Sequence, residues 1–454
     1  MKSYDVVVTG AGDVGIGIVF KAVAAKLKVA LIEKGNVGGT CVNVGCVPSK
    51  TLIYTADRIM EIRESSRFGI HAEITKIDFG SIMRRMKDAV GSGRSGIEEA
   101  IRDTRNLDFY NEEGHFIDEH TLKVGSKKIT AKKIFIATGA RIFVPPVSGL
   151  ERSGYLTSDS VLELERCPQS MIIIGGGYIS VEYGHFFSAM GSKVTIIERG
   201  SRLLAAEEPE ISNLLKKEMV KRMEILTNTE VLKVMRLSGG YDVIVKDHDT
   251  GEERKISAGK IMIATGRISN ADLVHVEKAG VKTDKRNFIV VNDYLETNRK
   301  HIWALGDAIG RQMFTHAGDK EAEIAWHNST HKKKIRMDFG AVPHAVFTHP
   351  QIASVGLTEE QAKQKYKVLV GRAKYSDTVK GTAMMEEEGF AKAIVEKTTK
   401  RILGFHIIGP EASTLIQEVV NVVVNKSDMK YITDSMHIFP ALPDLITETL
   451  GNLE

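Results

Sequence analysis

Short apolar runs, glycine turns and longer mixed stretches alternate through the first part of the chain, which predicts strands connected by helices. Residues 5–9 and 171–174 are apolar runs of strand length, each followed at once by a glycine-rich turn and a stretch of helical length. A second apolar run then ends at an acidic residue, Glu33 in the first case and Glu198 in the second. Each segment is therefore predicted to form a strand, helix, strand unit opened by a glycine turn.

This pattern occurs twice, because Gly10 and Gly175 open equivalent turns. The apolar runs 134–136 and 261–263 support a duplication, since each precedes the tripeptide Ala-Thr-Gly. A repeat on this scale indicates two nucleotide-binding domains rather than a solenoid.

The pattern changes near residue 340, where the nucleotide fingerprints end. Short apolar strands at 392–395 and 402–408 precede an apolar helix at 414–424, as in an α+β domain. A length of 454 residues agrees with about three domains at roughly 150 residues each. The predicted fold class is α/β, with two Rossmann-like dinucleotide-binding domains and an α+β C-terminal domain.

Charge, apolar runs and cysteine count limit the partners and the location that we expect for this protein. The net charge is +4 and 26% of residues are charged, so charge gives no indication of a nucleic-acid or membrane surface. No apolar run reaches 18 residues, so no transmembrane helix is expected. Three cysteines do not make a disulfide scaffold, and we expect a cytoplasmic protein.

The first glycine turn has the residues that a dinucleotide requires. Gly10 permits a tight turn, Gly12 lets the backbone approach a pyrophosphate, and Gly15 allows close helix packing. Glu33 is placed to accept hydrogen bonds from an adenosine ribose. Asp13 is unhelpful beside a pyrophosphate, and we expect its side chain to point away or to cap the helix.

The second turn contains Gly175 and Gly177, with Ser180 in place of a third glycine. Glu198 is predicted to bind ribose hydroxyls and to repel a 2′-phosphate, which favours NADH over NADPH. Arg199 and Arg202 keep the alternative open, since either could reach a 2′-phosphate. Two dinucleotide sites in one chain suggest electron transfer between a nicotinamide and a flavin.

Two cysteines, Cys41 and Cys46, lie in the segment 38–50, and the only other cysteine is Cys167. We interpret the pair as a redox dithiol; a structural zinc site would need four ligands, and two inert thiols are the other alternative. A helix is expected to begin near Cys41, where its dipole would lower a thiol pKa. Lys50 lies one helical turn after Cys46 and should face the same partner.

With these residues in place, the chain resembles the pyridine nucleotide–disulfide oxidoreductases, including dihydrolipoamide dehydrogenase and mercuric reductase, over essentially its whole length. The stretch Gly-Gly-Thr-Cys-x-Asn-x-Gly-Cys-x-Pro-Ser-Lys carries the resemblance. It implies an FAD-binding domain at 1–148 and 271–339, an NAD(P)-binding domain at 149–270, and a dimerisation domain at 340–454. It also implies a homodimer in which each C-terminal domain completes the active site of the partner.

The resemblance implies a role for each matching residue. Cys46 would lie against the flavin, Cys41 would exchange with substrate, and Lys50 would pair with Glu182. Tyr178 would cover the nicotinamide pocket when it is empty. The implied FAD contacts are Gly10, Gly12, Gly15, Glu33, Gly39, Thr40, Lys50, Gly114, Thr138, Gly139, Asp307, Met313, Phe314, Thr315 and His316. The implied nicotinamide nucleotide contacts are Gly175, Gly177, Tyr178, Ile179, Glu182, Glu198, Val231 and Gly266.

The chain departs from the family near its C-terminus. Disulfide-exchanging members have His-Pro followed by a glutamate, and that histidine is the acid and base for the thiols. Here Phe439 precedes Pro440 and Asp444 replaces the glutamate. A positioned base contributes about 10²–10⁴-fold, so dihydrolipoamide turnover should be poor. His437 is the nearest substitute, although a structural role for it is the simpler interpretation.

The expected activity is NADH-dependent, FAD-dependent disulfide oxidoreduction through Cys41 and Cys46, most like dihydrolipoamide dehydrogenase. Mercuric ion reduction is the alternative, because mercuric reductases resemble the Phe-Pro arrangement and Cys41 and Cys46 are soft ligands for Hg²⁺. Those enzymes usually carry a further cysteine pair, which this sequence does not contain, and no structural metal is expected. A weakened flavoprotein that acts by binding a partner is the third hypothesis.

Overall fold

The computed structural model describes residues 1–454, and contacts between residues divide the chain into two compact units. Unit 1 comprises Met1–Thr51, Gly80–Phe143 and Gly266–Phe339. Unit 2 comprises Leu52–Phe79, Val144–Thr265 and Gly340–Glu454. The boundaries of the three domains inferred from sequence stay a prediction.

Unit 1 is built on one mixed sheet in the strand order β3-β2-β1-β6-β5-β4. Strand β16 pairs with the C-terminal end of β6. The strands β1, β2, β3, β6 and β16 run parallel, as the pattern of the first fingerprint predicts. Their bounds are β1 Lys2–Thr9, β2 Val29–Ile32, β3 Leu107–Tyr110, β4 Gly114–Phe116, β5 Thr121–Val124, β6 Lys127–Ile136 and β16 Ile302–Ala304. A small antiparallel pair joins β7 (Ala140–Ile142) to β15 (Arg267–Ser269).

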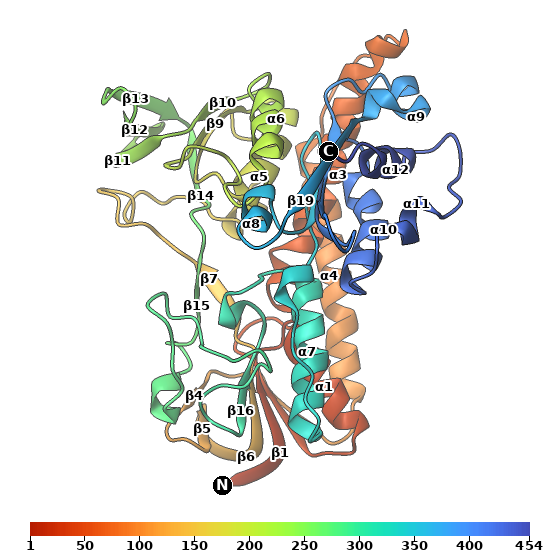
Figure 1. Ribbon diagram of the computed structural model, residues 1–454. Coiled ribbons are helices and arrows are strands. Elements are labelled where there is room, and N and C mark those ends of the chain that lie inside the picture. Colours follow the sequence, from red (N-terminus) through yellow and green to blue (C-terminus); the bar gives the residue numbers. More distant parts are fainter. The chain divides into compact units, whose positions relative to one another are not determined.

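Helices α1 (Asp13–Ala24) and α7 (Thr315–Thr330) lie beside each other against this sheet (Figure 1). Helix α1 buries Gly15, Ile18, Val19 and Ala22, the spacing of one helical face. The next helices along the chain are α2 (Gly39–Asn43), α3 (Cys46–Glu64) and α4 (Phe79–Asp103); α3 has its first residues in unit 1 and the rest in unit 2, and α4 belongs to unit 1 from Gly80 onward.

The dinucleotide-binding part of unit 2 is a four-stranded parallel sheet in the order β10-β9-β8-β14. Its strands are β8 (Ser170–Ile174), β9 (Lys193–Ile197), β10 (Glu224–Leu226) and β14 (Lys260–Ile263), with helices α5 (Tyr178–Ala189) and α6 (Pro209–Met219). A three-stranded antiparallel sheet follows, with β11 (Thr229–Leu237), β12 (Gly240–Asp247) and β13 (Glu253–Ala258). The two Rossmann-like units expected from the duplicated pattern are therefore present.

The C-terminal part of unit 2 is a five-stranded antiparallel sheet in the order β17-β18-β21-β20-β19. Its strands are β17 (His344–Val346), β18 (Ile352–Gly356), β19 (Val368–Lys374), β20 (Phe390–Glu396) and β21 (Ile402–Ile408). Helix α10 (Ala412–Val424) packs on β18 and β21, and α12 (Asp444–Gly451) packs on β19 and β20. The shorter helices are α8 (Glu359–Lys363), α9 (Val379–Ala383) and α11 (Lys430–Thr433). The predicted α+β character of this region is confirmed.

A buried lysine fastens the start of α6 to the C-terminal sheet. The side chain of Lys392 on β20 is 2% exposed, and its Nζ lies 2.9 Å from Glu208 and 2.7 Å from Glu210. A hydrogen bond from Arg372, reinforced by Lys392, lowers the pKa of Glu210 to about 2. A buried lysine needs such partners, because an unpaired buried charge is strongly unfavourable. The contact holds the loop before α6 in a defined position.

None of the helices combines the length and the hydrophobicity that crossing a membrane requires.

Candidate active site

The two cysteines lie on consecutive short elements of unit 1. Cys41 is on α2, whereas Cys46 is the first residue of α3. Both are free thiols joined by a hydrogen bond, and Cys46 Sγ lies 3.5 Å from Thr315 Oγ1 at the start of α7. A helix begins near Cys41 as expected, since α2 starts at Gly39, but it has only five residues and the long helix begins at Cys46.

The two thiols differ in acidity. The hydrogen bond with Cys41 lowers the pKa of Cys46 to about 6, although burial opposes this effect. Thr315 and the positive charge of Lys50 act in the same direction as that hydrogen bond. The contact with Cys46, together with burial, raises the pKa of Cys41. At neutral pH the reduced pair therefore has its thiolate on Cys46 and its proton on Cys41.

Asp13 affects this pair and does not cap its helix, so one of the two expectations is wrong; that its side chain points away from a pyrophosphate stays a prediction. The N-cap residue of α1 is Gly12, and no side chain caps the helix. The negative charge of Asp13 instead raises the pKa of both Cys41 and Cys46. Asp13 therefore opposes thiolate formation at the site where Lys50 favours it.

We expect Asp13→Asn to lower the apparent pKa of Cys46, because the substitution removes a negative charge that disfavours the thiolate. The pH dependence of thiolate absorbance in the reduced protein measures this change. Asp319→Asn is a matched control: Asp319 lies close enough to Asp13 for that charge to raise its pKa, but it contributes to neither cysteine. An unchanged or higher pKa in Asp13→Asn contradicts the assignment.

The first glycine turn is formed as the fingerprint requires. Gly10 has φ +100°, and a Cβ there would lie 2.2 Å from the carbonyl oxygen of Ala137. Glu33 Oε2 accepts a hydrogen bond from Ala11 N at 2.9 Å, so the acidic residue is held beside the turn. The backbone at Gly39 also approaches the turn, since a Cβ there would lie 2.7 Å from the Cα of Gly12. The turn and the segment that leads to Cys41 therefore form one surface.

Several buried polar atoms of unit 1 have no hydrogen-bond partner within the protein. They include Asn43 Oδ1, Thr138 Oγ1, Arg267 Nε and Glu321 Oε1. Buried polar atoms nearly always have a partner. Thr138 follows the residue that contacts Gly10, and Asn43 follows Cys41 on α2. These atoms fit a polar ligand at the turn and the cysteines, as a bound FAD would be.

Further residues of the predicted flavin site lie in the same unit. Asp307 is partly buried, which raises its pKa, and Arg267 Nε lies 3.7 Å from its carboxylate. Burial also raises the pKa of Glu321 to about 8, and Glu321 accepts a hydrogen bond from Gly306 N at 2.6 Å. Phe314 is the N-cap of α7. Sequence patterns do not predict Arg267 and Glu321, because no local motif identifies a buried charge that a distant strand or helix supplies.

The second glycine turn repeats the geometry of the first. Gly175 has φ +112°, and a Cβ there would lie 2.3 Å from the carbonyl oxygen of Ala264. A Cβ at Gly176 would lie 2.7 Å from the side chain of Glu198. Glu198 ends beside the turn, where its Oε1 accepts a hydrogen bond from Gly200 N at 2.5 Å. The turn and the acidic residue are therefore placed as in a nicotinamide nucleotide site.

The other predicted nicotinamide contacts lie on separate elements of the chain. Tyr178 is the first residue of α5, followed by Ile179, and Glu182 on this helix accepts a hydrogen bond from Phe347 N at 3.0 Å. Val231 lies on β11 and packs in a core cluster with Ile197 of β9. Gly266 belongs to unit 1, as does Lys50, whereas Glu182 belongs to unit 2. The pairing of Lys50 with Glu182 stays a prediction.

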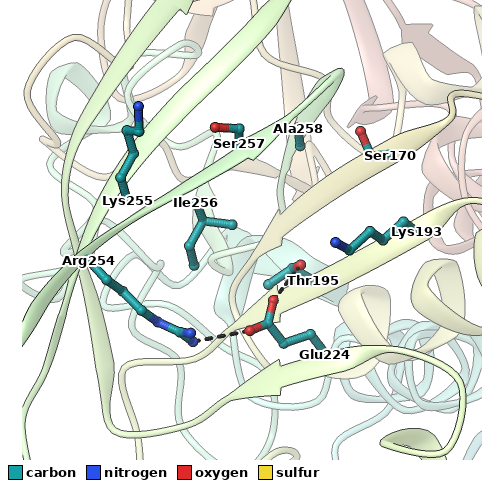
Figure 2. Close-up of a pocket in the computed structure, with 9 residues that line it drawn as sticks. All are labelled: Ser170, Lys193, Thr195, Glu224, Arg254, Lys255, Ile256, Ser257 and Ala258. Atoms are coloured by element: carbon teal, nitrogen blue, oxygen red, sulfur yellow. Dashed lines mark hydrogen bonds and ion pairs between the residues drawn. The ribbon is translucent and has the colours of Figure 1, made fainter.

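A polar cavity of about 360 Å³ opens between the parallel sheet and the antiparallel sheet of unit 2 (Figure 2). Ser170 and Lys193, which begin β8 and β9, line it together with Glu224, Arg254 and Lys255. Dinucleotides bind at the carboxyl ends of parallel strands, whereas this cavity lies at the amino ends. It is therefore separate from the predicted nicotinamide site.

The C-terminal segment presents Phe439 at the position of the family base. Phe439 is 70% exposed. Two groups of the same chain hold His437. Its Nε2 lies 2.7 Å from Glu418 Oε1, and its Nδ1 lies 3.1 Å from the carbonyl oxygen of Ser435. Asp444 begins α12 and accepts a weak hydrogen bond from Ala441 N at 3.5 Å. Both nitrogens of His437 are thus already engaged within the protomer.

One group outside the cysteine pair has the side chains of a metal site. The potential donor atoms of Glu119, His120 and His301 lie within 4.8 Å of one another. Arg299 already pairs with Glu119 at 3.4 Å, and His301 Nε2 bonds to the carbonyl of Glu119 at 3.0 Å. A bound cation would have to compete with the guanidinium.

The profile of the pyridine nucleotide-disulphide oxidoreductases matches residues 4–369, and the profile of their dimerisation domain matches residues 342–450. The chain belongs to the pyridine nucleotide-disulphide oxidoreductase family, whose enzymes use FAD and NAD(P)H. The predicted family and fold class are confirmed.

Among curated relatives, mercuric reductase of Lysinibacillus sphaericus is 34% identical over 91% of this chain and 76% of its own length. Dihydrolipoyl dehydrogenase of Chlamydia trachomatis is 34% identical over 99% of this chain and 96% of its own. The solved Cu(II) complex of the HOCl-induced flavoprotein disulfide reductase RclA from Escherichia coli superposes with a TM-score of 0.89 at 28% identity, covering 99% of both chains.

Proposed function

We propose that this protein is an NAD(P)H-dependent reductase whose Cys41–Cys46 dithiol reduces a thiophilic metal ion of the Hg²⁺ class. The observation that carries the proposal is Phe439 at the family's base position, combined with a proton held on Cys41. FAD, when bound, relays the electron pair between the nicotinamide and sulfur. The thiolate that receives the metal ion is that of Cys46, which Cys41, Thr315 and Lys50 stabilise.

Proton transfer distinguishes the two kinds of acceptor. Exchange with a disulfide needs a Cys41 thiolate and a proton for the departing thiol, and phenylalanine supplies neither acid nor base. A soft metal ion binds thiolates strongly and displaces their protons itself. The reaction balances as NAD(P)H plus Hg²⁺ giving NAD(P)⁺, Hg⁰ and H⁺. It needs no base at residue 439.

The similarity to mercuric reductases of Lysinibacillus sphaericus and Staphylococcus aureus supports this proposal. Disulfide substrates are the second candidate. They are favoured by the end-to-end similarity to dihydrolipoyl dehydrogenase, and by the presence of only three cysteines, which leaves no further pair to pass a metal ion inward.

We further propose that the protein is a homodimer that prefers NADH. The match to the dimerisation domain supports the dimer, as do exposed apolar side chains at Tyr431, Met436, Ile438 and Phe439. These residues would be covered by a second copy. Glu198 supports a preference for NADH, because its carboxylate would repel a 2′-phosphate. Arg199, which could instead bind a 2′-phosphate, is largely exposed.

The test is an anaerobic reduction of the holoenzyme by NADH, followed by addition of lipoamide or Hg²⁺ while NADH consumption is timed. We expect flavin reduction, a flavin–thiolate absorbance band, and turnover that is faster with Hg²⁺ than with lipoamide. Faster turnover with lipoamide would establish the disulfide candidate instead. Absence of flavin reduction would exclude both reductase functions and favour a flavoprotein that acts by binding a partner.

A further inference from the structure

A buried carboxylate in unit 2 holds the first residue of the nucleotide-binding helix. Glu207 is 2% exposed. Its Oε1 accepts hydrogen bonds from Tyr178 Oη at 3.0 Å and from His344 Nε2 at 2.5 Å, and its Oε2 accepts one from Ser354 Oγ at 2.7 Å. The donors come from α5, β17 and β18, so one carboxylate joins three elements.

These contacts keep Glu207 ionised although it is buried. Burial by itself would raise the pKa of Glu207, but the hydrogen bond and positive charge of His344, with help from Ser354, lower it. A hydrogen bond to an ionised acceptor is shorter and stronger than one between neutral groups. The Tyr178 hydroxyl is therefore bound to a charged partner.

Backbone hydrogen bonds fix this carboxylate relative to the glycine turn. Leu204 N donates to Gly176 O at 2.8 Å, and Glu207 N donates to Leu204 O at 2.8 Å. The adjacent Glu208 is bound to Lys392. The loop that carries Glu207 can thus move little with respect to the turn.

Tyr178 occupies the place where this restraint affects a ligand. It follows Gly177 directly and begins α5, and the helix N-terminus after a glycine turn is where a dinucleotide pyrophosphate binds. Its ring also lies 5.8 Å from the ring of His344. A bound nicotinamide nucleotide would meet this ring.

We propose that Glu207 and His344 form a latch that holds Tyr178 over the nicotinamide nucleotide site, and that nucleotide entry requires the Tyr178 hydroxyl to leave Glu207. The inference rests on the proposed function only in taking the second glycine turn as the NAD(P)H site. Glu207 and His344 are positioning residues, because they act through Tyr178. Sequence patterns gave no sign of either residue, since they are 137 positions apart.

The latch predicts that releasing Tyr178 tightens nucleotide binding. Breaking a hydrogen bond to a charged group is unfavourable, and removing that requirement should lower the dissociation constant about 5- to 30-fold. We expect Tyr178→Phe to show this decrease for NAD⁺ in titrations of the oxidised holoenzyme. The KM for NADH should fall in parallel, with a smaller change in kcat.

Two variants separate the latch from a general loss of structure. Tyr183→Phe removes the hydroxyl of another buried tyrosine on α5, which donates a 3.4 Å hydrogen bond to Ser158 O, and should leave NAD⁺ affinity unchanged. His344→Gln should tighten NAD⁺ binding in the same direction as Tyr178→Phe, because a neutral amide holds Glu207 less firmly. Unchanged or weaker NAD⁺ binding in Tyr178→Phe overturns the latch, as does an equal effect in Tyr183→Phe.

Failure of this inference is distinguishable from failure of the proposed function. NAD⁺ titration does not involve the electron acceptor, so a reductase that acts on disulfides would give the same result. Absence of any NAD⁺ binding in the unaltered holoenzyme would instead remove the nicotinamide site on which both depend.

Discussion

Cys46→Ser abolishes turnover with every acceptor, by an expected factor of at least about 10³, because serine cannot form the thiolate that receives electrons and binds metal. Cys46 has the lower pKa of the pair, at about 6, and lies beside Thr315 and Lys50. The flavin–thiolate absorbance band of the reduced holoenzyme should disappear in this variant. Steady-state NADH consumption and the anaerobic spectrum measure the two effects.

Cys41→Ser is the matched control for this experiment. It should lose turnover to a similar degree, because the pair can no longer form a disulfide, but it should keep the absorbance band. In Cys41→Ala, which has no donor at this position, the pKa of Cys46 should rise, since the hydrogen bond from Cys41 is the largest contribution that lowers it. A band that disappears in Cys41→Ser and persists in Cys46→Ser would reverse the assigned roles.

Phe439→His should raise lipoamide turnover by about 10²–10³-fold, because an imidazole at this position can remove the proton that Cys41 retains. Phe439 lies outside the core of its own chain, so the substitution requires no repacking of that core. Turnover with Hg²⁺ should change little, since metal binding displaces the proton without a base. The ratio of the two rates in one preparation measures the effect.

Two further variants define what the new histidine needs. Phe439→Leu should leave lipoamide turnover at its original level, because leucine also lacks a proton donor. The double variant Phe439→His, Asp444→Glu should exceed the single variant if the longer acid orients the imidazole, since Asp444 now bonds to Ala441 at the start of α12. No increase in either histidine variant would mean that a missing base does not limit disulfide turnover.

Local patterns were sufficient for the duplicated framework. The strand at 402–408 is predicted with the bounds that the structure has. The repeated Ala-Thr-Gly after 134–136 and 261–263 now has a physical explanation. In each domain the carbonyl of that alanine lies against the first glycine of the turn, Gly10 or Gly175, so closely that no Cβ could fit. The contact recurs because both domains keep the same strand pairing, β6 beside β1 and β14 beside β8.

The sequence by itself therefore determined the family, the two glycine turns and the redox pair, because short-range spacing specifies each of them. Only the tertiary structure decided which thiol is ionised, because the hydrogen bond between the two cysteines lowers the pKa of Cys46 and raises that of Cys41, and the charge of Lys50 also lowers the pKa of Cys46. It also placed Glu207 against Tyr178 and His344. Charges act through space, and their partners are set by how the strands and helices pack.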